Sequence, residues 1–146
     1  MQALYAFELG GGDAPHVLDT VVRKRLEEDA EAIEFATRLF LRTVDRREAA
    51  DRLIELHTQN WELSRIALID RLVLRMAIAE FMSFDDIPPK VTINEAIEVV
   101  KEYSTDRSGQ FVNGILDAVL AHLVADGALT KKGRGLVGMD DIEDRT

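Results

Sequence analysis

The sequence contains no cysteine, three prolines and one tryptophan among 146 residues. Without cysteine the chain forms neither disulfides nor thiolate metal sites, which fits a reducing cytoplasm. No apolar run approaches the length of about 20 residues that a membrane-spanning helix needs, and the chain does not open with a secretory signal. We therefore expect a cytoplasmic protein with one domain, large enough to bury a single hydrophobic core.

Positive charge is also scarce in this sequence. Eighteen lysines and arginines stand against 27 aspartates and glutamates, so the formal net charge is −9. Phosphate neutralisation supplies most non-specific affinity for nucleic acids, so an acidic protein is a poor non-specific binder. Any RNA-binding function must therefore come from a local patch of the surface.

Catalytic motifs are missing as well. The sequence has no P-loop, no GxGxxG, no nucleophile elbow and no HExxH. Its histidines, His16, His57 and His122, lie far apart, and none has metal-ligand spacing to another histidine or a carboxylate. His57 and His122 fall on or beside apolar faces, which favours partly buried structural histidines. We predict a protein that is not an enzyme and has neither cofactor nor metal.

The strongest pattern present is an apolar helix at residues 66–81. Its apolar residues recur at helical spacing and widen to nearly the whole circumference. A helix of this kind must be covered from several sides, which predicts the central helix of a bundle. We expect four of its side chains to be buried: Ile69, Leu72, Val73 and Met76.

Amphipathic segments before and after this helix indicate an all-α bundle of about seven helices. No segment alternates with the period of two that a strand requires. Asp45 is a predicted N-cap, and Thr92 with Glu95 has the spacing of a capping box. We predict a helical domain at residues 1–126 and a charged, mobile tail at residues 127–146.

Two sequence blocks stand out, VTINEAIE at residues 91–98 and FVNGILD at residues 111–117. In the second, Gly114 predicts the close approach of another helix, at a cost of about 1 kcal/mol in helix propensity. For Asn94 and Asn113 we likewise favour a structural role. Phe111 lies at the edge of an apolar stripe beside a polar loop at residues 104–109. It is either a core-edge residue, which the sequence alone favours, or a platform for base stacking.

Read with QALY at residues 2–5 and LRMAIAE at residues 74–80, these blocks closely resemble the NusB family of bacterial transcription antitermination factors. The resemblance covers about residues 2–125. It implies a protein that binds the boxA element of nascent RNA together with NusE, a small-subunit ribosomal protein. Such a pair joins the RNA polymerase antitermination complex, notably in ribosomal RNA operons.

The resemblance also implies site residues. RNA contacts correspond to Gln110 and Phe111, which favours the stacking role for Phe111. Contacts to NusE correspond to Tyr5 and Asp70, and we expect these two residues close together on an exposed surface.

Two departures from the family pattern affect RNA binding. No basic residue precedes Arg23, so the family's arginine-rich N-terminal arm is missing, and the lysine of the second block is replaced by Gln110. Arg107 and the cations of residues 131–134 would compensate in part. We therefore predict weak binding of boxA RNA by this chain alone. The alternative is a protein-binding module or homodimer that scarcely contacts RNA. A domain of an RNA methyltransferase is disfavoured because no cofactor-binding sequence follows.

Overall fold

The computed structural model describes residues 30–58, 66–103 and 106–139. They form five α-helices and one 3₁₀ helix and contain no strand, so the expected all-α fold is confirmed. The segments before residue 30, where we expected further helices, lie outside the described residues. The bounds are α3 (Ala30–Asp45), α4 (Arg47–His57), α5 (Leu68–Ser83), α6 (Pro89–Tyr103), α7 (Asp106–Ala125) and the 3₁₀ helix Gly133–Leu136.

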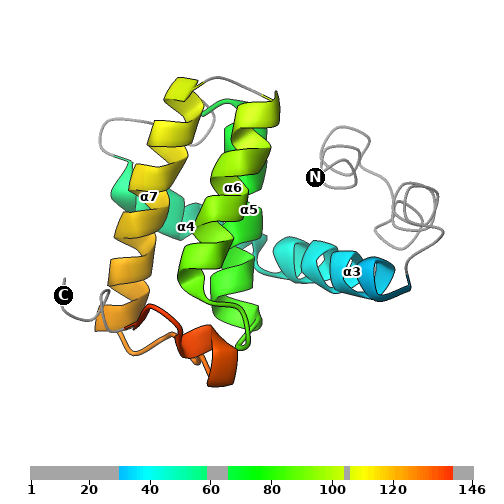
Figure 1. Ribbon diagram of the computed structural model, residues 1–146. Helices are drawn as coiled ribbons and strands as arrows, with labels where there is room; N and C mark the ends of the chain where they lie inside the picture. The colour runs from blue at the N-terminus through cyan, green and yellow to red at the C-terminus, as the bar shows by residue number, and fades with distance from the viewer. Residues whose placement is uncertain (1–29, 59–65, 104–105, 140–146) are drawn as a thin grey trace.

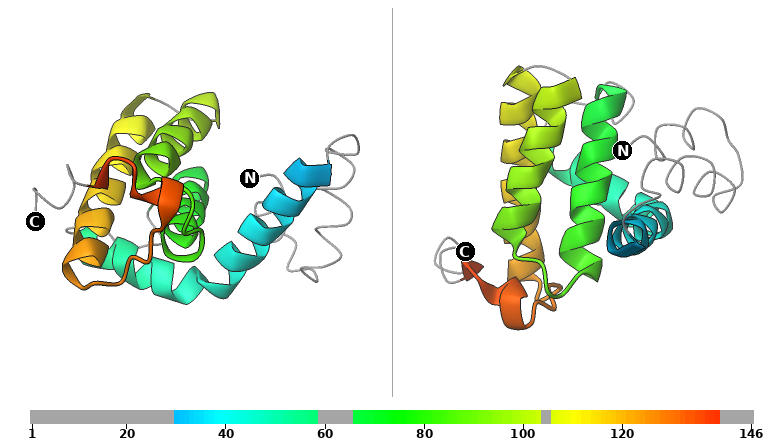
Figure 2. Two further views of the ribbon diagram at one scale, coloured as in Figure 1. Left: turned by 60° about the horizontal axis from the view of Figure 1, so that its bottom comes forward. Right: turned by 45° about the vertical axis from the view of Figure 1, so that its right-hand side comes forward.

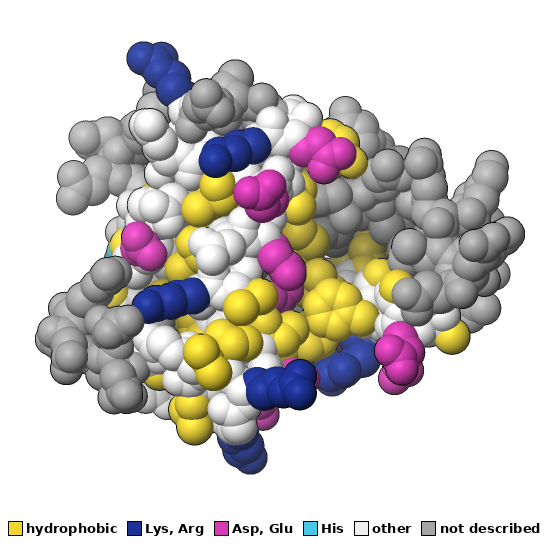
Figure 3. All heavy atoms as spheres, viewed as in Figure 1, with side chains coloured by type: hydrophobic (Ala, Val, Ile, Leu, Met, Phe, Trp, Pro, Cys, Tyr) yellow, Lys and Arg dark blue, Asp and Glu magenta, His cyan; other side chains and the backbone are white. Residues whose placement is uncertain are grey.

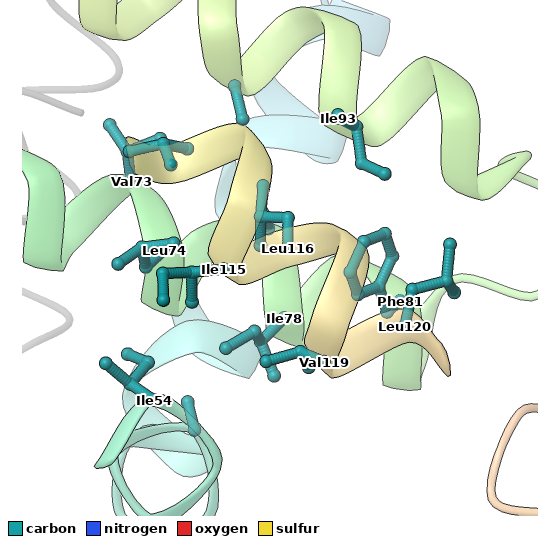
Figure 4. Packing of buried hydrophobic residues seen from close by; sticks show 14 of the residues in the cluster. Ile54, Val73, Leu74, Ile78, Phe81, Ile93, Ile115, Leu116, Val119 and Leu120 are labelled. Atoms are coloured by element: carbon teal, nitrogen blue, oxygen red, sulfur yellow. The ribbon is translucent and has the colours of Figure 1, made fainter. Parts of the chain in front are cut away.

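Helix α5 is the centre of the bundle, as expected, because α3, α4, α6 and α7 all pack against it (Figure 1). Its buried side chains meet those of α7, and Figure 4 shows Ile78 and Phe81 lying against Val119 and Leu120. Leu72 and Val73 are buried as predicted. Ile69 and Met76 are only half-buried, since four neighbouring helices still leave part of the circumference of α5 uncovered.

Helices α5, α6 and α7 run alternately up and down, whereas α3 projects away from them (Figures 1 and 2). One end of the bundle therefore carries the starts of α5 and α7. The opposite end carries the end of α5, the start of α6 and the residues that follow α7. None of the described helices is long and apolar enough to cross a membrane.

Two of the predicted helix caps are wrong. Helix α6 begins at Pro89, three residues before Thr92, so Thr92 lies inside the first turn. Its hydroxyl donates a hydrogen bond to Glu80 Oε1 at 2.6 Å. Proline is favoured at the first helical position because its fixed φ suits the helix and its missing N–H would have no partner there. Asp45 ends α3 instead of capping α4, whose N-cap is Arg46 without a side-chain hydrogen bond.

Helix α7 ends in a Schellman motif. The N–H of Ala128 bonds to the carbonyl of Leu123 at 2.9 Å, and Gly127 adopts a φ of 65°. This left-handed conformation is accessible to glycine at little cost, so the chain can turn back towards the bundle.

Residues 128–139, here called the C-terminal segment, are folded onto the end of α5 and correct our expectation of a mobile tail there. The Lys131 ammonium is buried and donates to the carbonyl oxygens of Phe84 at 2.6 Å and Glu80 at 3.2 Å. The segment also pairs with Asp85, whose backbone oxygen accepts the Lys132 N–H at 2.9 Å. The lysine adds a charged donor to two carbonyls that already accept backbone N–H groups, those of Phe84 and Ile87, at the end of the helix. Residues 140–146 lie outside the described residues.

Candidate nucleic-acid and partner interface

The predicted RNA-binding residues lie together on the first two turns of α7. We expected residues 104–109 to form a loop, but α7 begins at Asp106 and includes Arg107. Arg107, Gln110 and Phe111 therefore stand at positions i, i+3 and i+4, which share one helix face. Arg107 and Gln110 are exposed, and Phe111 packs half-buried against the core. One side of the Phe111 ring thus belongs to the core and the remainder is accessible.

The end of α6 adds two residues that our sequence analysis did not assign to the site. Lys101 is exposed and lies beside the first turns of α7, because its Cε would be 3.7 Å from a Cβ placed on Gly109. Tyr103, at the C-terminal end of α6, is 48% exposed. The position of Tyr103 at a helix end beside a polar stretch was the available signal. Two cations and two aromatic rings therefore gather at this end of the bundle.

Gly114 does not receive a neighbouring helix, contrary to our expectation. A Cβ placed there would meet nothing within 4 Å, and Gly114, Asn113 and Asn94 are all exposed. Glycine in an exposed helix interior costs about 0.5–1 kcal/mol relative to alanine, and nothing in the described residues offsets this cost. We define the α7 strip as Gln110, Phe111, Asn113 and Gly114. Gln110, Phe111 and Gly114 continue the face begun by Arg107, and Asn113 lies at its edge, one turn from Gln110.

Asp70 is not exposed as we expected, since only 6% of its surface is accessible. Its Oδ2 accepts a hydrogen bond of 3.0 Å from the hydroxyl of Ser108 in α7. The other carboxylate oxygen, Oδ1, is buried and has no hydrogen-bond partner among the described residues. Burial raises the pKa of Asp70 above its usual range, and the Ser108 hydrogen bond opposes that rise. Tyr5, its expected neighbour, lies outside the described residues.

Arg75 of α5 pairs with Asp51 of α4 rather than with Asp70. Its Nε and Nη2 donate to the two carboxylate oxygens at 2.7 and 3.0 Å. This bidentate geometry holds α4 across the central helix. Asp70 therefore lacks this arginine as a partner.

The basic residues of the C-terminal segment do not extend the α7 strip. Lys131 is buried against carbonyl groups, and the segment follows the far end of α7. A helix with the 20 residues of α7 is about 30 Å long, which separates Lys132 and Arg134 from Arg107. Local positive charge near the strip comes from Lys101 and Arg107.

His57 and His122, which are distant in sequence, lie edge to face with ring centroids 5.3 Å apart. His122 Nε2 is 3.1 Å from Asp126 Oδ2. Burial, followed by the charge of His122, lowers the pKa of His57. Within the described part of the chain, no three histidine or carboxylate side chains are placed to hold a metal ion.

Comparison with known proteins gives the chain its relatives. The NusB family model matches residues 1–121. The transcription antitermination protein NusB of Salinibacter ruber is 52% identical over 99% of this chain and 91% of its own length. The transcription antitermination protein NusB of Chloroherpeton thalassium is 42% identical over 99% of this chain and 69% of its own length.

Solved structures agree with this assignment. T. maritima NusB has a TM-score of 0.74 and 38% identity, and the match covers 81% of this chain and 82% of the other. A crystal structure of the antitermination factors NusB and NusE in complex with double-stranded RNA has a TM-score of 0.73 and 28% identity, with 80% and 86% covered. The chain belongs to the NusB family.

Proposed function

We propose that this protein is a transcription antitermination factor that binds boxA-type RNA together with the ribosomal protein NusE. The pair acts within the RNA polymerase antitermination complex. The observation that carries the RNA part is the α7 strip, where exposed polar groups, a half-exposed aromatic ring and an unexplained glycine share one face. Two similarities support these partners. The relatives are transcription antitermination proteins named NusB, and one similar solved structure holds NusB and NusE in complex with double-stranded RNA.

The chemistry of the strip suits unpaired RNA. Arg107 and Lys101 supply the positive charge for phosphates, and bases stack on Phe111 and Tyr103. Gln110 carries an amide that can both donate to and accept from a base edge.

Gly114 and Asn113 extend the same surface by one turn. The missing side chain of Gly114 lets an RNA backbone approach the helix, and the neighbouring amide of Asn113 supplies a donor and an acceptor. This role accounts for a glycine that the packing of the bundle does not require.

NusE approaches the side of the bundle that carries Asp70. A buried carboxylate oxygen without a partner costs free energy, and a donor from NusE that reaches Oδ1 would recover it. Because Asp70 is 6% exposed, the groups that cover it must move when that donor arrives. Tyr5 is proposed as the second contact. This is a binding role without catalysis, carried out on nascent RNA in the cytoplasm.

Titration of labelled boxA and scrambled RNA, with and without NusE, at about 50 and 200 mM salt tests the proposal. We expect weak binding of boxA alone, tighter binding with NusE, and a clear preference over the scrambled sequence. Equal affinity for both RNAs would contradict the proposal. Binding of NusE without any RNA binding would favour the protein-binding module.

A further inference from the structure

An open groove of about 450 Å³ lies at the end of the bundle opposite the start of α7. Its walls include Phe35 of α3, Val91 and Glu95 of α6, and Val137 of the C-terminal segment. Ile87 and Pro88, in the turn between α5 and α6, also line it. Figure 3 shows apolar side chains gathered on the lower half of the molecular surface that faces the viewer.

The apolar side chains of the groove are exposed to an unusual degree. Phe35 is 38%, Val91 41% and Val137 64% accessible, and Leu136 beside them is 55% accessible. Phe35 is held in place because its ring packs on Phe84 with centroids 5.5 Å apart. Contiguous exposed apolar surface of this kind marks a binding groove more often than scattered apolar residues do.

Negative charge predominates in the groove lining. The carboxylates are those of Glu80, Asp86 and Glu95, against the single cation Arg134. Lys131, which lies behind Glu80, is engaged by backbone carbonyls and points its ammonium at the end of α5. An occupant with positive charge beside apolar groups therefore complements this lining.

We propose that the groove binds a protein segment in which aliphatic side chains are flanked by lysine or arginine. The aliphatic groups would cover Phe35, Val91 and Val137, and the cations would meet Asp86 and Glu95 at the rim. RNA does not fit, because the exposed carboxylates of Asp86 and Glu95 repel phosphate. A second copy of this chain fits poorly, since each copy carries a net charge of −9.

This surface is separate from the proposed RNA and NusE surfaces. Asp70 and Glu80 are ten residues apart on α5, which corresponds to about 15 Å along the helix. The α7 strip lies at the same end as Asp70 (Figure 1). The protein would therefore hold RNA, NusE and a third, basic segment at the same time.

The test uses the full chain and a fluorescein-labelled amphipathic helix made of leucine and lysine. Its control peptide carries glutamate in place of every lysine. Fluorescence anisotropy gives the dissociation constants for the protein and four variants. Val137→Ser and Glu95→Lys alter the groove at exposed positions, whereas Leu56→Ser and Glu55→Lys make matching changes at exposed positions of α4.

We expect the basic peptide to bind and the acidic peptide not to bind. Val137→Ser and Glu95→Lys should each weaken binding about threefold to tenfold, and the two α4 variants should leave it unchanged. The proposal is overturned if the basic peptide does not bind, if the acidic one binds equally, or if the α4 variants weaken binding as much. A dimer of the protein that Val137→Ser dissociates would assign the groove to a second copy and also overturn it.

Discussion

The hydroxyl of Ser108 donates to Asp70 Oδ2 at 3.0 Å and joins the first turn of α7 to the first turn of α5. The first two turns of α7 also carry Arg107, Gln110 and Phe111. Beside the core packing of the two helices, this hydrogen bond links the proposed RNA surface to the carboxylate proposed to meet NusE. A hydrogen bond to a charged group contributes about 1.5–3 kcal/mol, which is enough to hold the two helix ends in register.

We predict that Ser108→Ala lowers the free energy of unfolding by about 1–3 kcal/mol, because it leaves the buried Asp70 carboxylate with one hydrogen bond fewer. The pKa of Asp70 should rise further, since the lost bond favours the ionised form. Urea denaturation measures the first effect and a carbon-detected NMR titration the second. Ser83→Ala is the control, because the Ser83 hydroxyl oxygen is buried and has no hydrogen-bond partner in the part of the chain that the structure describes. Equal losses for the two variants would refute the prediction.

Gly114→Ala should raise the stability of the protein and lower its affinity for RNA. Because the position is open and helical, alanine should raise the free energy of unfolding by about 0.5–1 kcal/mol. The added methyl group stands where the RNA backbone is proposed to approach, so affinity for boxA RNA should fall. Thermal denaturation and RNA titration check the two effects. A more stable variant with unchanged RNA affinity would remove Gly114 from the proposed site.

Lys131→Met should lower the free energy of unfolding by about 1.5–3 kcal/mol per charged hydrogen bond that the helix end loses. The carbonyls of Glu80 in α5 and of its C-cap Phe84 would lose this charged donor and keep only their backbone hydrogen bonds. Lys132→Met, an exposed neighbour, should have little effect. Guanidinium denaturation compares the two variants. Similar stabilities would mean that the C-terminal segment does not support α5 through this lysine.

Gly135→Ala should detach the C-terminal segment from the bundle. A Cβ at this position would collide with the carbonyl oxygen of Asp85, and that backbone atom cannot rotate away. Faster proteolysis within residues 128–139, seen by mass spectrometry, is the expected result. Digestion at the wild-type rate would show that the segment adjusts without leaving the bundle.

His57 should make stability sensitive to mild acid. Its pKa is lowered in the folded protein, chiefly by burial and then by the charge of His122. Below about pH 6.5 the unfolded chain therefore binds a proton that the folded protein resists, and stability falls as the pH falls. His57→Gln should flatten this dependence between about pH 7 and 5. Denaturation curves with the same pH slope for both proteins would contradict the assignment.

The central helix could be predicted from the sequence because its apolar residues cover nearly the whole circumference, and such a helix has to be enclosed. Helix starts were harder to predict. Thr92 and Glu95 have the spacing of a cap, yet Pro89 begins the helix earlier and Thr92 bonds to Glu80 instead. The partner lies on another helix, and spacing along one segment contains no information about it.

The same limit applies to the site. Gln110 and Phe111 were identified from the family resemblance and Arg107 as a compensating cation, but their shared face depends on α7 beginning at Asp106. Lys131 has the sequence context of a solvated charge, and only the fold brings it to the carbonyls at the end of α5. Asp70 looked like an exposed charge on an apolar helix, and Ser108 covers it from 38 residues away.

The most direct test of the account is the affinity for boxA RNA, in the presence of NusE, of the protein and of Phe111→Ala and Arg107→Ala at several salt concentrations. Stacking on Phe111 should contribute about 1–3 kcal/mol, so Phe111→Ala should weaken binding about 5- to 150-fold without changing the salt dependence. Arg107→Ala should lower the slope of log affinity against log salt by about one. If both variants bind boxA RNA like the unaltered protein at every salt concentration, the RNA does not contact α7 and the account is contradicted.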